Sequence, residues 1–230
     1  VPQRPFDSHK WKAALYAVAG SSGMMGAANL CSASAMRAGA GIVHVASPGI
    51  VSDRSTSTEI VRRALPALGW SHEVLDDLSR FKAIVIGPGL GRDEGTVSEA
   101  RRIIAGAHIP MVIDGDGLFA VAWGGEGARD IVRSRAAGTV LTPHDGEYTT
   151  LLGYAPSHDR ITSARRLASD TNCVCLLKGT TTVVAEPSGE VLMVANGDQR
   201  LATAGTGDVL AGIIGALLAQ GVEPFHAAAS

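Results

Sequence analysis

A glycine-rich turn near the end of the chain holds the residues best suited to chemistry: Gly205, Thr206, Gly207 and Asp208. Glycines let backbone N–H groups converge on one point, and the apolar segment that follows is predicted to be a helix whose N-terminus adds partial positive charge. Together they would form an anion hole for a transferring phosphoryl group, with Asp208 placed to accept the proton of an attacking hydroxyl. The alternative is that Asp208 only caps the helix after a flexible turn.

A second motif, T-P-H-D-G-E at 142–147, follows a short apolar run. His144 can donate a hydrogen bond to a substrate oxygen, and Glu147 can hold a water on Mg²⁺, a cation that usually keeps much of its hydration. The alternative is a simple helix start, in which Glu147 interacts with the helix dipole and His144 is merely exposed.

One cation and several hydroxyls follow another apolar run, in the segment Lys178, Gly179, Thr180, Thr181 and Thr182. These side chains could contact the phosphate or the ribose of a nucleotide. The alternative is that Lys178 is simply solvated, as a lone lysine at the end of a strand usually is.

A glycine cluster at 87–91 directly follows the apolar run 83–86 and approaches a dinucleotide-binding fingerprint. Arg92 stands where the third glycine of G-x-G-x-x-G would be, and Asp114 lies at about the distance of a ribose-binding acid. A hydride-transferring Rossmann enzyme is therefore a rival hypothesis, weakened by the missing glycine. Asp114 and Asp116 could instead orient a phosphate-bound metal or close a turn. The sequence has no G-x-x-x-x-G-K-[ST] motif, which excludes a P-loop kinase.

The elements that must position these motifs follow a repeated pattern of a short apolar run, glycine and a longer helix-like segment. The predicted strands are 14–19, 42–46, 83–86, 111–113, 138–141, 174–177, 182–185 and 191–194. The predicted helices are 26–38, 73–78, 96–105, a segment after Gly117, 147–152, 161–170 and 208–220. The pattern predicts an α/β domain with a mostly parallel sheet that binds ligands at the carboxyl ends of its strands. The last two strands are predicted to form an antiparallel hairpin.

Length and composition fit one domain with one large core, since the chain has 230 residues and 46% hydrophobic content. The net charge of −2 argues against nucleic acid or an acidic membrane surface as a partner, and no apolar run approaches the ~18 residues of a membrane span. Cys31, Cys173 and Cys175 lack metal-ligand spacing, so we interpret them as reduced packing residues of a cytoplasmic protein.

Both ends of the chain indicate a fragment. Residues 1–12 are polar, contain proline and are interpreted as a linker, which leaves 13–230 as the domain. Near the other end, Pro224 is predicted to open a helix that the sequence cuts short, so a C-terminal truncation is expected.

Taken in order, the motifs are similar to those of one enzyme family. The matching segments are Gly20-Ser21, Gly26-Ala27-Ala28, 38–43, 87–91, Thr142-Pro143-His144-x-Gly146-Glu147, Lys178-Gly179 and Gly205-x-Gly207-Asp208. From about Lys12 to Ala228 the sequence resembles the ADP-dependent (S)-NAD(P)H-hydrate dehydratases of the ribokinase-like superfamily. The pair T-P-H-x-G-E and G-x-G-D is the specific part of the resemblance.

The resemblance implies a three-layer α/β/α fold and the repair of nicotinamide cofactors damaged by hydration. The hydroxyl of the S epimer of NADH or NADPH hydrate would be phosphorylated by ADP or ATP with Mg²⁺, and phosphate would then leave and restore the reduced ring. This sequence of steps explains a kinase-type anion hole in a dehydratase, because hydroxide is a poor leaving group and phosphate a good one.

The resemblance also implies roles for individual residues. By the family pattern, Asp208 would contact the hydrate and act as the base. The residues expected to bind the hydrated dinucleotide with it are Ala27, Gly89, Gly91 and His144. The residues expected to bind the nucleotide are Lys178, Gly179, Thr180, Thr181, Thr182, Gly205, Thr206 and Gly207. The sequence departs from the pattern at Met25 and Asp145, where family members often have proline.

The resemblance further implies a homo-oligomer, a tetramer by the family pattern, and an NAD(P)H-hydrate epimerase as a fused domain or functional partner. The chain would then be the C-terminal domain of a bifunctional repair enzyme. Two other functions are carried as alternatives: a small-molecule kinase of the hydroxymethylpyrimidine or thiazole type, which shares the G-x-G-D turn, and a nucleotide-binding module without turnover. His144 within T-P-H-x-G-E argues against the first, and Asp208 with Lys178 against the second.

Overall fold

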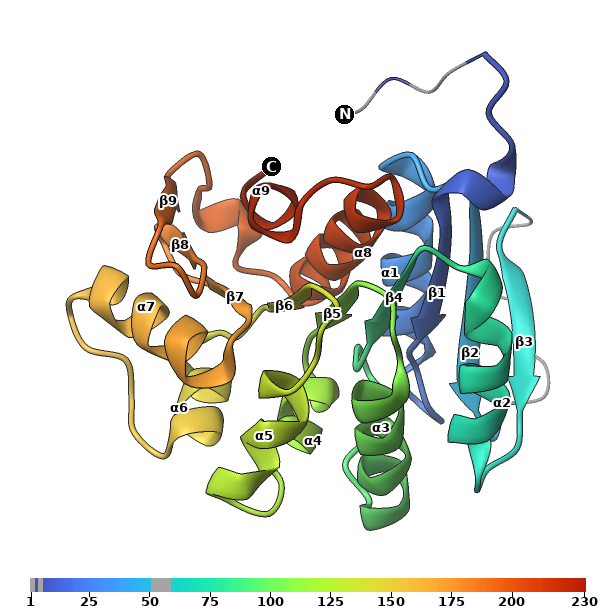
Figure 1. Cartoon of the computed structure of the whole chain (residues 1–230), viewed down its shortest axis with the longest axis horizontal. Helices are drawn as coiled ribbons and strands as arrows, with labels where there is room; N and C mark the ends of the chain where they lie inside the picture. Colours follow the sequence, from blue (N-terminus) through green and yellow to red (C-terminus); the bar gives the residue numbers. More distant parts are fainter. Residues whose placement is uncertain (1–2, 4–5, 51–58) are drawn as a thin grey trace.

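The computed structural model describes residues 3, 6–50 and 59–230, which form one sheet covered by helices on both faces (Figure 1). The sheet has the strand order β3-β2-β1-β4-β5-β6-β7-β8-β9. The strands are β1 Ala14–Val18, β2 Ile42–Pro48, β3 Val61–Leu65, β4 Ala83–Ile86, β5 Met111–Ile113, β6 Thr139–Leu141, β7 Val174–Leu177, β8 Thr182–Ala185 and β9 Val191–Val194. All neighbours from β3 to β7 pair in parallel, and β7-β8-β9 pair antiparallel. The predicted mostly parallel sheet with its hairpin is confirmed.

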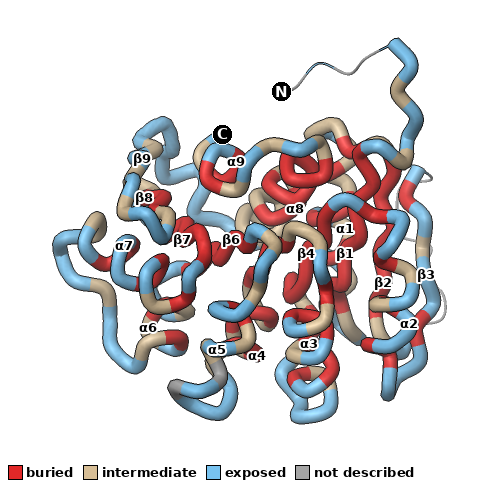
Figure 2. Tube along the Cα trace, viewed as in Figure 1, coloured by how far each residue is buried: buried red, intermediate tan, exposed pale blue. Residues whose placement is uncertain are grey.

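Two groups of helices make the outer layers. The helices are α1 Met25–Arg37, α2 Trp70–Asp77, α3 Glu94–Gly106, α4 Asp116–Ala122, α5 Asp130–Arg133, α6 Asp145–Leu152, α7 Arg160–Thr171, α8 Thr206–Ala219 and α9 Pro224–Ala229. One apolar cluster joins α1, α8 and α9 to one face of the sheet, and a second joins α2 to α7 to the other. The central strands are buried on both faces, whereas the outer sides of the helices are exposed (Figure 2). The three-layer fold is therefore confirmed.

Helix boundaries differ from the predicted ones mainly at the start. Six predicted helices begin one to three residues earlier than expected, and in α3, α6 and α7 a capping side chain precedes the periodic apolar pattern. Asp93, for example, accepts a hydrogen bond from the backbone N–H of Thr96 and opens α3. At the boundary between the expected linker and the domain, Lys10–Ala13 forms the 3-10 helix η1, and Trp11 packs edge-on against Phe81.

The edge strand β3 was not predicted. Its sequence, V-R-R-A-L, carries two arginines and has only its last residue buried, so it lacks the continuous apolar run that marks the central strands. The strand is present because it pairs in parallel with β2, with His44 opposite Val61.

Close approach between neighbouring elements requires glycine at two places. Gly87, directly after β4, has a φ of 119°, and a Cβ there would lie 1.9 Å from the carbonyl oxygen of Asp114. On α8, a Cβ at Gly212 would lie 2.1 Å from the carbonyl oxygen of Cys31 on α1. The loops after β4 and β5 are thus pressed together, and α8 lies directly against α1.

All three cysteines are buried and unpaired, as the sequence predicted. Among the residues that the structure describes, no helix is both long and apolar enough to cross a membrane.

Candidate functional site

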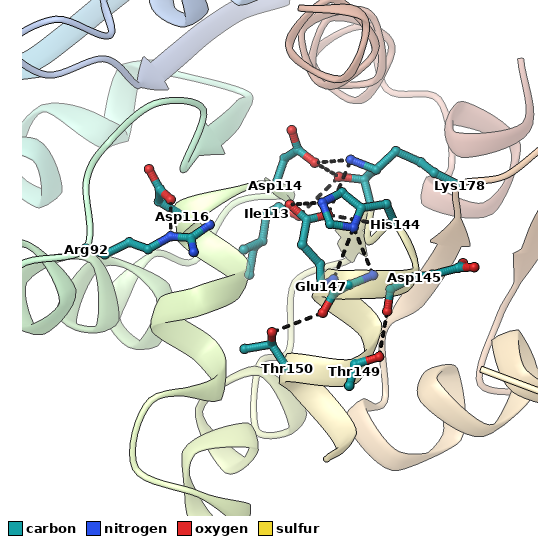
Figure 3. Close-up of polar contacts among 12 residues, drawn as sticks. Arg92, Ile113, Asp114, Asp116, His144, Asp145, Glu147, Thr149, Thr150 and Lys178 are labelled. Atoms are coloured by element: carbon teal, nitrogen blue, oxygen red, sulfur yellow. Dashed lines mark hydrogen bonds and ion pairs between the residues drawn. The ribbon is translucent and has the colours of Figure 1, made fainter. Parts of the chain in front are cut away.

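The carboxyl ends of three adjacent parallel strands bring the predicted polar residues together. Asp114 follows β5, Thr142 and His144 follow β6, and Lys178 follows β7. Figure 3 shows Lys178, His144 and Glu147 close to Asp114, with Arg92 and Asp116 on the other side of Asp114.

Lys178 is held by two carboxylates at the centre of this group. Its Nζ lies 2.9 Å from Asp114 Oδ1 and 3.5 Å from Glu147 Oε2. Burial alone would lower the pKa of Lys178, but the negative charges of Asp114 and Glu147 outweigh it and raise the pKa. The Thr142 hydroxyl donates to the same Asp114 oxygen at 2.7 Å, which fixes that carboxylate. Lys178 is therefore a charged, positioned ammonium rather than a solvated one, with 21% of its side chain exposed.

The glycine turn of α8 meets this ammonium. Gly205 is the N-cap residue and has a left-handed φ of 92°, and Gly207 lies in the first turn of the helix. A Cβ on Gly207 would lie 3.5 Å from Lys178 Nζ and 3.8 Å from Asp114 Oδ2, so the backbone of the turn faces the ion pair directly. A helix N-terminus and a lysine thus converge on one place, which suits a phosphoryl group.

The other residues predicted for the nucleotide have different surroundings. The hydroxyl of Thr206 lies 2.9 Å from the carbonyl oxygen of Thr203, so it holds the turn together. Gly179 and Thr180 are exposed in the turn after β7, and Thr181 and Thr182 are partly buried at the start of β8. These four residues form the part of the segment that follows Lys178.

Asp208 is half-buried in the first turn of α8, close to other acids. Burial raises the pKa of Asp208, and the negative charge of Asp114 raises it further. Lys178 acts in the opposite direction, and Asp116 adds a smaller upward effect. A carboxylate with a raised pKa is a stronger base than a free aspartate, as proton abstraction from a hydroxyl requires.

His144 serves as the N-cap of α6 through Nδ1, and its Nε2 lies 3.6 Å from Glu147 Oε1. Its Nδ1 accepts hydrogen bonds from the backbone N–H groups of Gly146 and Glu147 at 3.0 and 3.2 Å. In return, Glu147 Oε2 accepts from the backbone N–H of His144 at 2.9 Å, which completes a capping box. Because Nδ1 accepts, the neutral ring carries its proton on Nε2. With 59% of the side chain exposed, His144 can donate from Nε2 to a bound molecule.

The residues predicted to bind the substrate lie beside the ion pair, around the loop after β4. Gly89 and Gly91 have left-handed φ values of 60° and 98°. A Cβ on Gly89 would lie 2.9 Å from the Cβ of Ala27, so α1 and this loop are in close contact. The hydroxyl of Ser21 donates to the carbonyl oxygen of Gly89 at 2.9 Å, which joins the loops after β1 and β4.

Two residues at the site have no signal in the sequence. Arg160, at the start of α7, donates from Nη2 to the carbonyl oxygen of Lys178 at 2.7 Å and packs against Gly179. Leu30 on α1 lies against Gly205, where a Cβ would come within 2.4 Å of its Cδ1. Neither residue belongs to a glycine-rich or polar motif, so only the packing of α7 and α1 places them here.

Within the described part of the chain, no three His, Cys, Asp or Glu side chains gather into a ready-made metal cage. Mg²⁺ does not require one, because it commonly uses one or two carboxylates, its own waters and nucleotide phosphates. Glu147, which the sequence predicted as a water-mediated ligand, is 13% exposed and engaged by the His144 backbone and Lys178. Its carboxylate and that of Asp114 are compatible with such a site once phosphates are bound.

Comparisons of the sequence and of the structure with known proteins point to the same enzyme family. A family model described as NAD(P)H-hydrate dehydratase matches residues 15–230. The chain is 38% identical over 247 residues to a bifunctional NAD(P)H-hydrate repair enzyme of Moorella thermoacetica, an alignment that covers 100% of this chain and 45% of the relative. The chain thus spans about half the length of this relative.

Two solved structures share the fold. An ADP/ATP-dependent NAD(P)H-hydrate dehydratase from Bacillus subtilis, co-crystallized with ATP and Mg²⁺, is 28% identical with a TM-score of 0.80, covering 99% of this chain and 80% of that one. A ribokinase-like superfamily protein from Enterococcus faecalis is 25% identical with a TM-score of 0.81, covering 95% and 75%.

Proposed function

The chain belongs to the NAD(P)H-hydrate dehydratase family, and from that premise we propose that it dehydrates the S epimer of NADH or NADPH hydrate in a nucleotide-dependent reaction. The observation that carries the proposal is the position of Asp208. It stands at the N-terminus of α8, where Gly207 faces the ammonium of Lys178. A base, an anion hole and a cation at one point are what phosphorylation of a hydroxyl requires.

In the proposed reaction, Asp208 accepts the proton of the hydrate hydroxyl while the hydroxyl oxygen attacks the terminal phosphoryl group of ADP or ATP. AMP or ADP leaves with the electron pair of the broken phosphorus–oxygen bond. The new phosphate ester then leaves as phosphate with a ring proton lost, which restores the reduced nicotinamide. The N–H groups of the 205–207 turn and Lys178 stabilise the charge that develops on the phosphoryl oxygens.

Further assignments of residues belong to this proposal. Ala27, Gly89, Gly91 and His144 bind the hydrated dinucleotide, with His144 donating from Nε2. Gly179 and the three threonines after it contact the nucleotide together with Gly205 and Thr206. Mg²⁺ bound with the nucleotide would neutralise phosphate charge, with Glu147 holding one of its waters.

The proposal extends to the whole protein in which the domain occurs. Its relatives are named as bifunctional, and we propose that the other activity is the epimerase that interconverts the hydrate epimers. We also propose residues 13–230 as the domain, in a cytoplasmic homo-oligomer, a tetramer by family resemblance. A small-molecule kinase would share the α8 turn, but neither the family match nor the repair-enzyme relatives favour it.

The test uses chemically hydrated NADH with Mg²⁺ and either ADP or ATP. We expect the near-ultraviolet absorbance of the reduced ring to return, and we expect Asp208→Asn to abolish this while still binding ADP. The dehydratase assignment fails if the wild-type protein binds a nucleotide and leaves the hydrate unchanged with both donors. Release of a stable phosphorylated product from a hydroxymethylpyrimidine or thiazole substrate would favour the kinase instead.

A further inference from the structure

Arg92 lies on the loop after β4, next to Gly91, and is tied to that loop through Asp116. Its Nε donates to Asp116 Oδ1 at 2.6 Å, and the backbone N–H of Gly91 donates to Asp116 Oδ2 at 2.8 Å. Asp116 begins α4 and has 17% of its side chain exposed, so its carboxylate holds the Arg92 guanidinium and the Gly91 backbone in place. The arginine side chain and the glycine loop are therefore fixed relative to each other.

The guanidinium of Arg92 is also oriented by an aromatic ring. Its Cζ lies 4.9 Å from the centroid of the Phe119 ring, and 58% of the side chain is exposed. Among the residues that the structure describes, none is within hydrogen-bond distance of its two Nη groups. Arg92 therefore presents a pre-oriented pair of donors, the geometry that binds a phosphate through two parallel hydrogen bonds.

Arg92 stands close to the centre at which the hydroxyl would react. Gly87, on the same loop, is in close contact with the carbonyl oxygen of Asp114, and Asp114 Oδ2 lies 3.8 Å from the Cβ position of Gly207, next to Asp208. Figure 3 shows the side chain of Arg92 running from its loop toward the side on which Asp114 and His144 lie. A dinucleotide whose nicotinamide reaches Asp208 and whose chain passes Gly89 and Gly91 would bring its phosphates past Arg92.

We propose that Arg92 is a substrate-binding residue, whose two Nη groups hold a phosphate of the hydrated dinucleotide. This inference rests on the proposed function. The Arg92–Asp116 pair is neutral as a whole, so recognition depends on the directed donors of the guanidinium rather than on net positive charge. A lysine at this position could keep the ion pair with Asp116, but its single tetrahedral nitrogen could not offer two parallel donors in a fixed plane.

The phosphate has two possible sources within the substrate. The bridging diphosphate occurs in both NADH hydrate and NADPH hydrate, whereas the 2′-phosphate occurs only in NADPH hydrate. If Arg92 holds the diphosphate, its loss weakens both substrates equally. If it holds the 2′-phosphate, only NADPH hydrate is affected, and Arg92 then sets the preference between them.

The experiment measures kcat and KM of Arg92→Gln and Arg92→Lys with both hydrates at saturating ADP. The matched control is Arg166→Gln, since Arg166 also faces an aspartate through Nε, lies over an aromatic ring and is 62% exposed, but stands on α7 away from the site. We expect KM for at least one hydrate to rise about tenfold or more in both Arg92 variants, because a charged hydrogen bond is lost. We expect kcat, KM for ADP and the control to stay unchanged.

Three results would overturn the inference. The first two are an unchanged KM for both hydrates and a rise in KM for ADP alone. The third is a wild-type KM for the hydrates in Arg92→Lys, which would mean that only the ion pair with Asp116 matters. If the wild type does not turn over either hydrate, the proposed function fails, and calorimetric titration with NADH and NADPH tests Arg92 separately. Weaker dinucleotide binding by both variants would then support the inference, and equal binding or no binding by the wild type would overturn it.

Discussion

At the scale of single residues, Asp208 determines how the proposed reaction depends on pH. The base must be ionised, and burial together with the charge of Asp114 raises its pKa above the ordinary aspartate value. We therefore expect single-turnover rates to fall as the pH drops through this raised pKa, with a midpoint above the ~3.9 of a free aspartate. A pH profile of the restored absorbance measures it, and a midpoint at or below the free value would contradict the assignment.

The same raised pKa predicts a cost in stability. A carboxyl group that binds its proton more tightly in the folded state stabilises the fold below its unfolded pKa, and this contribution is lost as the pH rises through the folded pKa. At neutral pH the ionised Asp208 therefore destabilises the protein, and we expect Asp208→Asn to raise the Tm. Thermal unfolding at pH 7 measures the change.

Asp93 provides the control for this experiment. Its pKa is lowered, chiefly by the hydrogen bonds with Thr96 at the start of α3, so its ionised form stabilises the folded state. We expect Asp93→Ala to lower the Tm by removing that cap. If the Asp208→Asn protein melts below the wild type, repulsion among the carboxylates of Asp208, Asp114 and Asp116 does not destabilise the folded protein.

Sequence reasoning about single residues could propose roles for them but not their local partners. For Glu147, the alternative of a helix-start role is present as a capping box with His144, and an ion pair with Lys178 accompanies it. The motif alone could not show the ion pair, because Lys178 lies outside the motif, after the next strand, β7.

At the scale of elements, the contact between α8 and α1 depends on glycine. A Cβ at Gly212 would meet the carbonyl oxygen of Cys31 and the hydroxyl of Ser34, and neither neighbour is the end of a flexible chain. We expect Gly212→Ala to lower the free energy of unfolding by about 1–3 kcal/mol, as overpacking does. Because α8 carries Asp208, we expect activity to fall as well. Urea unfolding and the turnover assay measure the two effects.

Gly26 gives the matched comparison on α1. It lies inside that helix with a helical backbone, and nothing stands within 4 Å of a Cβ placed there. Gly26→Ala should therefore leave the protein as stable as before or more stable by up to about 1 kcal/mol. Equal destabilisation by both substitutions would show that α8 does not need glycine for its contact with α1.

Elements were predictable where burial is continuous and were missed where it is not. The runs at β4 and β7 are buried at every position and were predicted within their observed bounds. Edge strand β3 has only its last residue buried and is defined by its pairing with β2, which no local pattern encodes. The small 3-10 turns and α5 were missed for a similar reason, since four residues carry too little periodicity.

At the scale of the whole molecule, the three cysteines report on global unfolding. All are buried, and burial raises the pKa of Cys173 to about 12 and the pKa values of Cys31 and Cys175 as well. We expect none to react with a thiol reagent in the native protein and all three to react in urea, with one midpoint. Fast labelling without denaturant would contradict the single well-packed core.

The assembly of the site could be predicted only in part. The pattern of strands shows that polar residues following parallel strands lie at one edge of the sheet, and Asp114 and Lys178 do meet there although they are 64 residues apart. It does not give the strand order, which puts β6 between β5 and β7 and brings Thr142 to the same carboxylate. Arg160 and Leu30 reach the site through helix packing, for which the sequence offers no pattern.

The order of the sheet has one more consequence. β1 lies between β2 and β4, and the chain leaves β1 for α1 on one face of the sheet but leaves β4 for α3 on the other. The two connections therefore leave on opposite faces of the sheet, while the loops at their starts meet above it, where Ser21 donates to the carbonyl oxygen of Gly89. Substitutions in these loops can change which molecule fits beside them, but they leave unchanged the strand order that brings the loops together. The ligand of this fold can therefore change through loop substitutions while the binding position at the carboxyl ends of the strands stays the same.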